Sequence, residues 1–445
     1  MSDSAKVPVG NIGDIAAAEC SSAVNCISSC EGCISNTDHS ADVPRYDCST
    51  MTDELHFNKA MHTPSACAKV LCDGDSGTLE QCSLQERVMD ISSQDLHTVP
   101  DSIFDVADGI TVLDMAYNSL VNIPESLCQS LIHITNLSVA GNELTELPCA
   151  ISFLSQLVDL NVSSNKLASF PSSIVALSKL RSFNFSTNEV SMLPAEFGRL
   201  TALCKVVGYE NKLEYLPDTF GLLRQLSTLE LNDNCLSCLP RNFGFLTSLK
   251  MLNLSVNKLS SLPESFSNLK LVEVLDLSDN LLVALPSRFK SCRLIRQLFV
   301  AKNGLHTLPD WFCNLPELEE LVLNDNQLAE SPLPENLGDV SVKLKTFEIA
   351  GNYIRHLPES LGRLSRLHKI HIGSSIHELE RKNFQNGNWV WKLPLNFGSL
   401  ISLRHANLNE NQICELPSDF GNLIRLEWLD LGMSCSRFCL LSVLI

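Results

Sequence analysis

Positive charge is scarce in this chain of 445 residues. The sequence contains 33 Lys and Arg residues against 51 Asp and Glu residues, which gives a formal net charge of −18 at pH 7. Nucleic-acid binding depends on basic contacts to phosphate, and anionic membrane surfaces attract basic segments. The composition therefore argues against both kinds of partner.

The usual signatures of catalysis are also absent from the sequence. There is no Gly-x4-Gly-Lys-Ser/Thr phosphate loop, no Gly-x-Gly-x-x-Gly turn, no His-Glu-x-x-His helix and no Gly-x-Ser-x-Gly elbow. Cys26, Cys30 and Cys33 match no zinc-finger spacing, and Cys20 or His39 would have to complete a ligand set. We expect free thiols rather than a metal site, and we expect no enzyme activity and no cofactor.

What the sequence does contain is a repeated phrase. Leu229–Pro240 reads Leu-Glu-Leu-Asn-Asp-Asn-Cys-Leu-Ser-Cys-Leu-Pro, and similar phrases occupy Leu252–Pro263 and Leu275–Pro286, each 23 residues further on. Self-similarity at a fixed period of this size indicates a solenoid. One asparagine marks the repeat, and from Asn142 to Asn326 every step is 23 residues.

With Gln94, Ser375 and Ser434 in the same place in three degenerate copies, the pattern gives about 15 copies. The asparagines are Asn118, Asn142, Asn165, Asn188, Asn211, Asn234, Asn257, Asn280, Asn303, Asn326, Asn352 and Asn411.

Each part of the phrase has a physical role. The Leu-x-Leu alternation predicts a short strand whose Leu side chains enter a core shared by neighbouring copies. The Asn amide is expected to bond backbone groups of adjacent copies, so that the asparagines form a ladder. The Leu-Pro pair ends the strand, because Pro cannot donate a ladder hydrogen bond. Gly208 stands where a core Leu is expected, which predicts a local void.

On this phrase and period, the sequence resembles the leucine-rich repeat family over more than three quarters of its length. The resemblance implies an α/β solenoid: a horseshoe with a parallel β-sheet on its concave side, about 15 repeats, and short 3-10 or irregular convex segments. Leu193–Leu200, Leu262–Leu269 and Leu416–Leu423 each read Leu-Pro-x-x-Phe-x-x-Leu. They resemble the Ras-group (plant-intracellular-Ras-group-like) subtype, which implies a cytoplasmic signalling scaffold for small GTPases or kinases.

Three segments are expected along the chain. Residues 1–84 carry 12 acidic and 4 basic residues without periodicity, which predicts a mostly disordered, cysteine-containing tail. The solenoid is expected over 85–433, with an insertion at about 376–392. Residues 434–445 form an apolar tail without the rest of the repeat phrase, which suggests a truncated end; a membrane or dimer contact is the alternative.

The compartment depends on cysteines in the tail. No apolar run is long enough to cross a bilayer, and the start of the chain has no secretory h-region. Both features favour a reducing, cytoplasmic location. Secreted members of the resembled family carry a disulfide cap before the first repeat, so oxidised Cys67, Cys72 or Cys82 would instead indicate an extracellular recognition module. An inhibitory regulatory subunit of an enzyme is a further alternative.

The side chains flanking the core Leu positions should point out of the concave side. These columns hold three basic residues, Lys205, Lys302 and Lys369, and aromatics at Tyr117, Tyr209, Phe299 and Trp428. The acids are Asp90, Asp114, Asp159, Glu210, Glu230, Asp233, Asp276, Asp279, Glu320, Asp325, Glu348, Glu410 and Asp430. The excess of acids predicts a surface for a partner protein with a basic face; a solvated face that only maintains solubility is the alternative.

Two tryptophans lie within the expected insertion. Trp389 and Trp391 are interpreted either as part of a loop folded onto its own copy or as anchors for a partner. The predicted partner-binding residues are Asp159, Tyr209, Glu230, Asp233, Asp276, Asp279, Phe299, Glu320, Asp325, Glu348, Trp389 and Trp391.

Overall fold

The computed structural model describes residues 87–287, 289, 293–374 and 387–432. The chain separates into two compact units, Met1–Glu80 and Gln81–Ile445, and every described residue belongs to the second unit. The tail expected over 1–84, its cysteines and the segment 434–445 therefore lie outside the described residues.

One parallel sheet of 15 strands runs through the second unit, and each strand pairs with the strand of the next copy. Leu229 aligns with Leu252, and Leu252 with Leu275, so the core Leu residues stay in register. The strands are β1 (Val88–Asp90), β2 (Val112–Asp114), β3 (Asn136–Ser138), β4 (Asp159–Asn161), β5 (Ser182–Asn184), β6 (Lys205–Val207), β7 (Thr228–Glu230), β8 (Met251–Asn253), β9 (Val274–Asp276), β10 (Gln297–Phe299), β11 (Glu320–Val322), β13 (Thr346–Glu348), β15 (Lys369–His371), β16 (His405–Asn407) and β17 (Trp428–Asp430). Two further short strands, β12 (Ala329–Glu330) and β14 (Tyr353–Ile354), pair separately.

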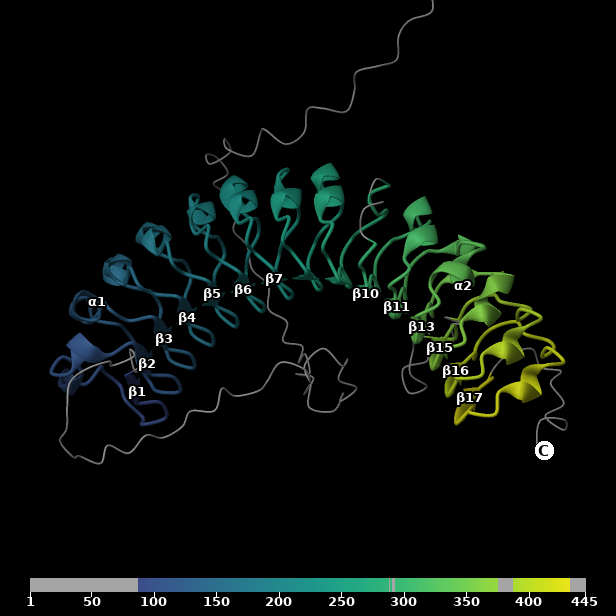
Figure 1. Ribbon diagram of the computed structural model, residues 1–445, viewed down its shortest axis with the longest axis horizontal. Helices are drawn as coiled ribbons and strands as arrows, with labels where there is room; N and C mark the ends of the chain where they lie inside the picture. Colours follow the sequence, from purple (N-terminus) through teal and green to yellow (C-terminus); the bar gives the residue numbers. More distant parts are fainter. Residues whose placement is uncertain (1–86, 288, 290–292, 375–386, 433–445) are drawn as a thin grey trace, which may run out of the picture. The chain divides into compact units, whose positions relative to one another are not determined.

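The return segments contain short helices on the side of the solenoid opposite the sheet (Figure 1). Several begin directly after the Pro of the repeat phrase, which has a φ of −66° before η8, because Pro fixes φ in the range a helix start needs. The 3-10 helices are η1 (Asp101–Ile103), η2 (Ala107–Gly109), η3 (Cys149–Phe153), η4 (Ser172–Ala176), η5 (Phe197–Arg199), η6 (Asp218–Leu222), η7 (Phe243–Phe245), η8 (Glu264–Asn268), η9 (Asp310–Asn314), η10 (Glu359–Arg363), η12 (Phe397–Ser399) and η13 (Phe420–Asn422). Two short α-helices, α1 (Glu125–Ser130) and α2 (Leu337–Val340), occupy the same place in their copies.

The core is a continuous stack of inward Leu side chains closed by phenylalanines of the return segments. The rings of Phe197, Phe220, Phe243 and Phe266 follow one another at centroid distances of 5.9, 6.5 and 6.0 Å, nearly parallel. All four rings are almost completely buried. One copy cannot bury these faces alone, whereas the array can. The architecture confirms the predicted solenoid with short convex 3-10 segments.

The repeat asparagines link the copies through their side-chain amides. Asn234 donates from Nδ2 to the carbonyl of Gly208 in the preceding copy at 3.0 Å and to Leu231 in its own copy at 3.2 Å. Its Oδ1 accepts the backbone N–H of Leu213 at 3.0 Å. All 12 asparagines of the expected ladder make both bonds to the preceding copy.

The void expected at Gly208 is not present. Phe185, on the preceding copy, fills the space, and a Cβ added to Gly208 would lie 2.2 Å from its Cζ atom. The glycine therefore accommodates an unusually large neighbour, because a Leu at position 208 could not fit beside that ring. The expectation of a void was wrong because it considered one copy without its neighbour.

Candidate functional site

The outward side chains of the sheet form a surface on which the repeats place many acidic residues. In β7, Leu229 is completely buried, while Thr228 and Glu230 on either side of it remain partly exposed. The same alternation recurs in the other strands because successive side chains of a strand point to opposite faces. We divide the surface into a central surface, the outward residues of β4–β9 and the turns after them, and a C-terminal surface, those of β11–β17.

Three carboxylates of the central surface are charged in an unfavourable environment. Burial raises the pKa of Asp159, Glu230 and Asp276 above the ordinary values. Lys205 opposes the shift at Asp159 and Glu230 through its positive charge, and the backbone N–H of Ser278 opposes it at Asp276 with a 2.9 Å hydrogen bond. Lys205 is the only Lys or Arg among the outward strand residues of β4–β9, all of which the structure describes. Among the residues that the structure describes, the negative charge of these three carboxylates is compensated only in part.

The acids of the following turns lie at the rim of this surface. Asp233 and Asp279 both have a φ of 53°, the left-handed conformation that the turn before each ladder asparagine requires. Asp233 accepts a hydrogen bond from the side-chain amide of Asn232 at 2.8 Å, and Asp279 lies 3.9 Å from the Nζ of Lys302. Both side chains are exposed. Tyr209, which lies in the turn after β6, is half-buried.

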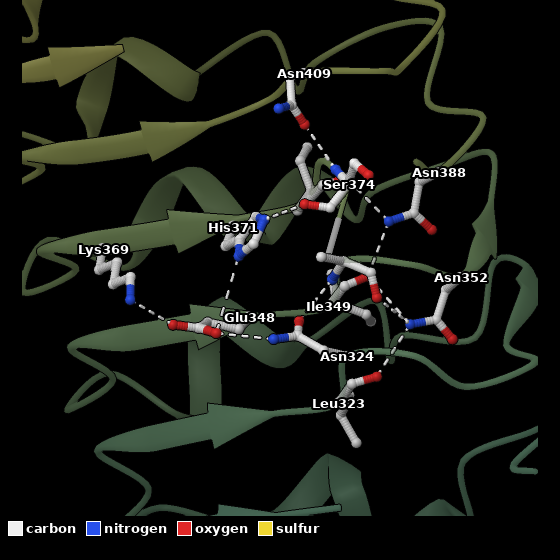
Figure 2. Close-up of polar contacts among 12 residues, drawn as sticks. Leu323, Asn324, Glu348, Ile349, Asn352, Lys369, His371, Ser374, Asn388 and Asn409 are labelled. Carbon is white, nitrogen blue, oxygen red and sulfur yellow. Dashed lines mark hydrogen bonds and ion pairs between the residues drawn. The ribbon is translucent and has the colours of Figure 1, made fainter. Parts of the chain in front are cut away.

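On the C-terminal surface, polar side chains bind one another across copies (Figure 2). Glu348 on β13 accepts from Lys369 Nζ at 2.7 Å and from the side-chain amide of Asn324 at 2.8 Å. Burial alone would raise the pKa of Glu348, but the hydrogen bond and charge of Lys369, with Asn324 and His371, outweigh it, and the pKa is lowered. This carboxylate is therefore stabilised in its charged form.

The same network continues to the following copies. His371 Nε2 lies 3.0 Å from the carbonyl oxygen of Ser374, and the Ser374 N–H donates to Asn409 Oδ1 at 2.7 Å. The amide of Asn409 then donates to Asp430 Oδ2 at 2.8 Å. Sequence reasoning selected Glu348 from this group but not Asn324, His371 or Asn409, because outward polar residues of neighbouring copies cannot be paired without their register.

The remaining predicted surface residues differ in accessibility. Glu320 accepts a hydrogen bond from the Gln297 amide at 2.9 Å, and Asp325 is half-buried. Phe299 and Glu410, both expected to be outward, are only 6 % exposed. The ring of Phe299 therefore offers a partner little contact area.

Trp389 and Trp391 lie in a regular copy of the repeat phrase, whereas residues 376–386 of the expected insertion lie outside the described residues. Asn388 donates to the carbonyls of Ile349 at 2.8 Å and Ile372 at 2.9 Å, and its Oδ1 accepts the N–H of Ile354 at 3.0 Å. These are the ladder bonds, and Ser375, which was expected to hold this place, lies outside the described residues. The phrase Asn388–Pro394 was the signal in the sequence that could have identified this copy.

Both tryptophans are partly exposed, Trp389 at 39 % and Trp391 at 50 %. The Trp389 ring contacts Tyr353 at a centroid distance of 5.6 Å, and the Arg355 guanidinium carbon lies 5.2 Å from the centroid of Trp389. The Trp391 ring contacts His356 at 5.9 Å. The group is an aromatic patch supported by its own copy and the preceding one.

A pocket of about 260 Å³ opens where β9, β10, β11 and β13 begin. Its charged walls are already paired: Glu319 binds Arg296 at 2.5 Å and Lys345 at 2.7 Å, and Glu273 lies 3.9 Å from Lys250. Counted together with Glu320, which also lines the pocket, three acids meet three bases, so these charges balance.

Within the ranges that the structure describes, no group of three or more His, Cys, Asp or Glu side chains is placed to hold a metal ion. Among those same residues, no helix has the length and apolar character needed to cross a membrane.

Comparison with known proteins agrees with this geometry. A family model described as "Leucine rich repeat" matches residues 240–282. A leucine-rich repeat protein of Leptospira interrogans is similar in structure, with a TM-score of 0.68 and 27 % sequence identity over 79 % of this chain and 91 % of that one. The fold is a leucine-rich repeat solenoid.

Other similar solved structures share less of their length with this solenoid. The Arabidopsis receptor kinase HAESA, solved with the peptide hormone IDA and the co-receptor SERK1, has a TM-score of 0.63 and 26 % identity over 73 % of this chain and 54 % of that one. An internalin of Listeria monocytogenes has a TM-score of 0.62 at 19 % identity, covering 74 % of this chain and 89 % of that one, and shows the fold alone. No curated protein sequence matches the chain. The leucine-rich repeat fold is that of a protein–protein interaction module.

Proposed function

We propose that this protein is a non-enzymatic scaffold that binds a partner protein with a basic face on its central and C-terminal surfaces. The observation that supports the proposal most strongly is the raised pKa of Asp159, Glu230 and Asp276. Burial disfavours the charged form of these carboxylates, and Lys205 is the one Lys or Arg among the outward strand residues around them. A basic partner would stabilise the charged form by supplying the missing positive charges.

The partner class is proposed from the repeat subtype. The Leu-Pro-x-x-Phe-x-x-Leu phrases resemble the Ras group, so we propose a cytoplasmic role in which small GTPases or kinases are bound. Peptide recognition outside the cell is the second candidate, because HAESA, with 26 % identity, was solved with a peptide hormone. Disulfide mapping of Cys67, Cys72 and Cys82 separates the two, since only the extracellular role needs these cysteines oxidised.

A quantitative test uses the full chain and a fluorescein-labelled peptide of alternating Lys and Ala residues. The variant Glu230→Lys/Asp276→Lys/Glu320→Lys should bind this peptide at least about tenfold more weakly, because like charges across an interface cost several kcal/mol. The control Glu125→Lys/Glu335→Lys/Glu415→Lys changes the net charge equally at exposed positions away from the outward strand residues, and it should retain most of the affinity.

The same two variants serve as baits for affinity capture from cell lysate. We expect small GTPases or kinases with the parent chain and the control, and their loss with the first variant. Equal peptide affinity and identical captures for both variants would contradict the proposed binding surface.

A further inference from the structure

The tautomer of His371 follows from its hydrogen bond. Nε2 lies 3.0 Å from the carbonyl oxygen of Ser374, and a carbonyl oxygen can only accept, so Nε2 carries the proton. A neutral imidazole has one ring proton, which leaves Nδ1 bare. Nδ1 lies 3.9 Å from Glu348 Oε2. Two acceptors therefore face each other, and only a second proton on the ring can join them.

The surroundings keep this second proton off at neutral pH. Burial lowers the pKa of His371 from its ordinary value of 6.5, and Lys369 on the same strand lowers it further. Glu348 on β13 and Asp325 after β11 oppose this shift in part. On the other side, the register partner of His371 on β16 is Asn407, a neutral residue. The ring therefore becomes charged only as the pH falls below about 6.5.

Protonation changes the net charge of the cluster. At neutral pH the charges of Glu348 and Lys369 cancel, since their side chains pair at 2.7 Å. A charged His371 adds a positive charge next to this pair, and its side chain is 18 % exposed, at the floor of the C-terminal surface. A basic partner then meets a positive cluster where it had met a neutral one.

We propose that His371 makes partner binding acid-sensitive: a proton taken up by its ring adds positive charge beside Glu348 and weakens the binding of a basic partner on the C-terminal surface. The proposal rests on the proposed function, because it regulates the same surface.

The test compares the full chain with His371→Gln, whose side-chain amide can still donate to the Ser374 carbonyl. The labelled Lys-Ala peptide is titrated at pH 7.5 and pH 5.5, a range in which its lysines stay charged. We expect the parent chain to lose about threefold more affinity on acidification than His371→Gln does. This is the factor expected when one unit charge on His371 repels one peptide lysine in water at a distance somewhat longer than that of a direct ion pair. Protonation of the carboxylates on the central surface lowers the peptide affinity of both proteins equally. His133→Gln removes an exposed histidine of a return segment and should behave like the parent.

A second measurement needs no partner. Because the folded pKa of His371 is below the unfolded value, its contribution to stability is complete above about pH 6.5 and is lost as the pH falls through the folded pKa. The parent chain should therefore lose more stability to urea between pH 7.5 and 5.5 than His371→Gln does.

Equal acid-weakening of peptide binding in the parent and His371→Gln would overturn the proposal. If neither protein binds the peptide at pH 7.5, the proposed function fails and the regulation of binding fails with it. The urea measurement then still decides whether His371 takes up a proton in this range.

Discussion

The central and C-terminal surfaces are built on the same frame and differ in how their acids are compensated. In the central surface, Glu230 and Asp276 are charged against burial, with pKa values raised. In the C-terminal surface, Glu348 is held by Lys369 and Asn324, and its pKa is lowered. A solenoid can thus place carboxylates at equivalent positions and leave them destabilised by burial in one region but stabilised by their neighbours in another.

The difference arises from the adjacent copy rather than from the acid itself. Glu230 pairs in register with Val207 and Asn253, and the charge of Lys205 on β6 offsets its pKa shift only in part. Glu348 pairs in register with His371 and bonds Lys369 directly at 2.7 Å. Neighbouring strands are about 4.8 Å apart, so a cation one copy away can reach the carboxylate. The pKa of an outward acid therefore depends on its burial and on whether a side chain one copy away bonds it directly.

The largest expected effect tests whether the asparagine ladder stabilises the copies under both surfaces. Asn234→Ala and Asn388→Ala should each lower the free energy of unfolding by about 1–3 kcal/mol for every buried backbone group left without a partner. Asn388 should cost as much as Asn234, although it follows a step of 36 residues from Asn352. Urea denaturation of the full chain measures both values.

The control for this comparison is Asn232→Ala. Asn232 is outward, and among the described residues its side-chain amide donates to its neighbour Asp233 at 2.8 Å rather than to another copy, so the loss should be within about 0.5 kcal/mol. A loss at Asn388 as small as that at Asn232 would show that the ladder does not continue through this copy.

The next effect has opposite signs in the two regions. Glu348→Gln should destabilise the protein by about 1–2 kcal/mol, because Lys369 loses its charged partner. Glu230→Gln should stabilise it, because a carboxylate that burial disfavours is replaced by a neutral amide of the same shape. Urea midpoints of the two variants against the parent measure the contrast, and destabilisation by Glu230→Gln would remove the distinction between the surfaces.

Acid should act on the two regions in opposite directions as well. The pKa of Glu230 in the folded protein is above the unfolded value of 4.5. Protonation of Glu230 therefore stabilises the folded state relative to the unfolded state as the pH falls from neutral towards 4.5. The folded pKa of Glu348 is below 4.5, so its contribution is complete above pH 4.5 and is lost below it.

The advantage of Glu230→Gln over the parent should accordingly shrink on acidification from pH 7 to pH 4.5. The deficit of Glu348→Gln, measured in proteins that also carry His371→Gln so that the neighbouring imidazole does not titrate, should change only below pH 4.5. Urea midpoints of these proteins across this range measure both trends. A pH-independent advantage of Glu230→Gln would show that its carboxylate is not disfavoured by the fold.

The sequence was sufficient to predict the solenoid because the phrase specifies strand, turn and return segment within each copy. Contacts between copies were harder to predict. Two of them depend on the neighbouring copy: the packing of Phe185 beside Gly208 and the hydrogen bonds of Asn388. The strand pattern placed Phe299 correctly, but it did not predict that the ring is nearly covered. The acids were found as columns, but their pairing with Lys369 or Asn324 required the register. Their role as a binding site stays a prediction.

The smallest expected effect leaves every charge of the comparison unchanged. Val256 occupies the turn position that Asp233 and Asp279 fill in the adjacent copies, with a φ of 52°. This left-handed conformation disfavours a β-branched residue and is tolerated by Asn and Asp. Val256→Asn should therefore stabilise the protein by about 1 kcal/mol or less, whereas Asp279→Asn, which starts from a tolerated residue, should gain nothing. Since Val256→Asn relieves backbone strain without adding charge, it should leave peptide affinity unaltered, and a change in affinity would mean that the backbone of this turn, rather than the carboxylates around it, determines binding to the central surface.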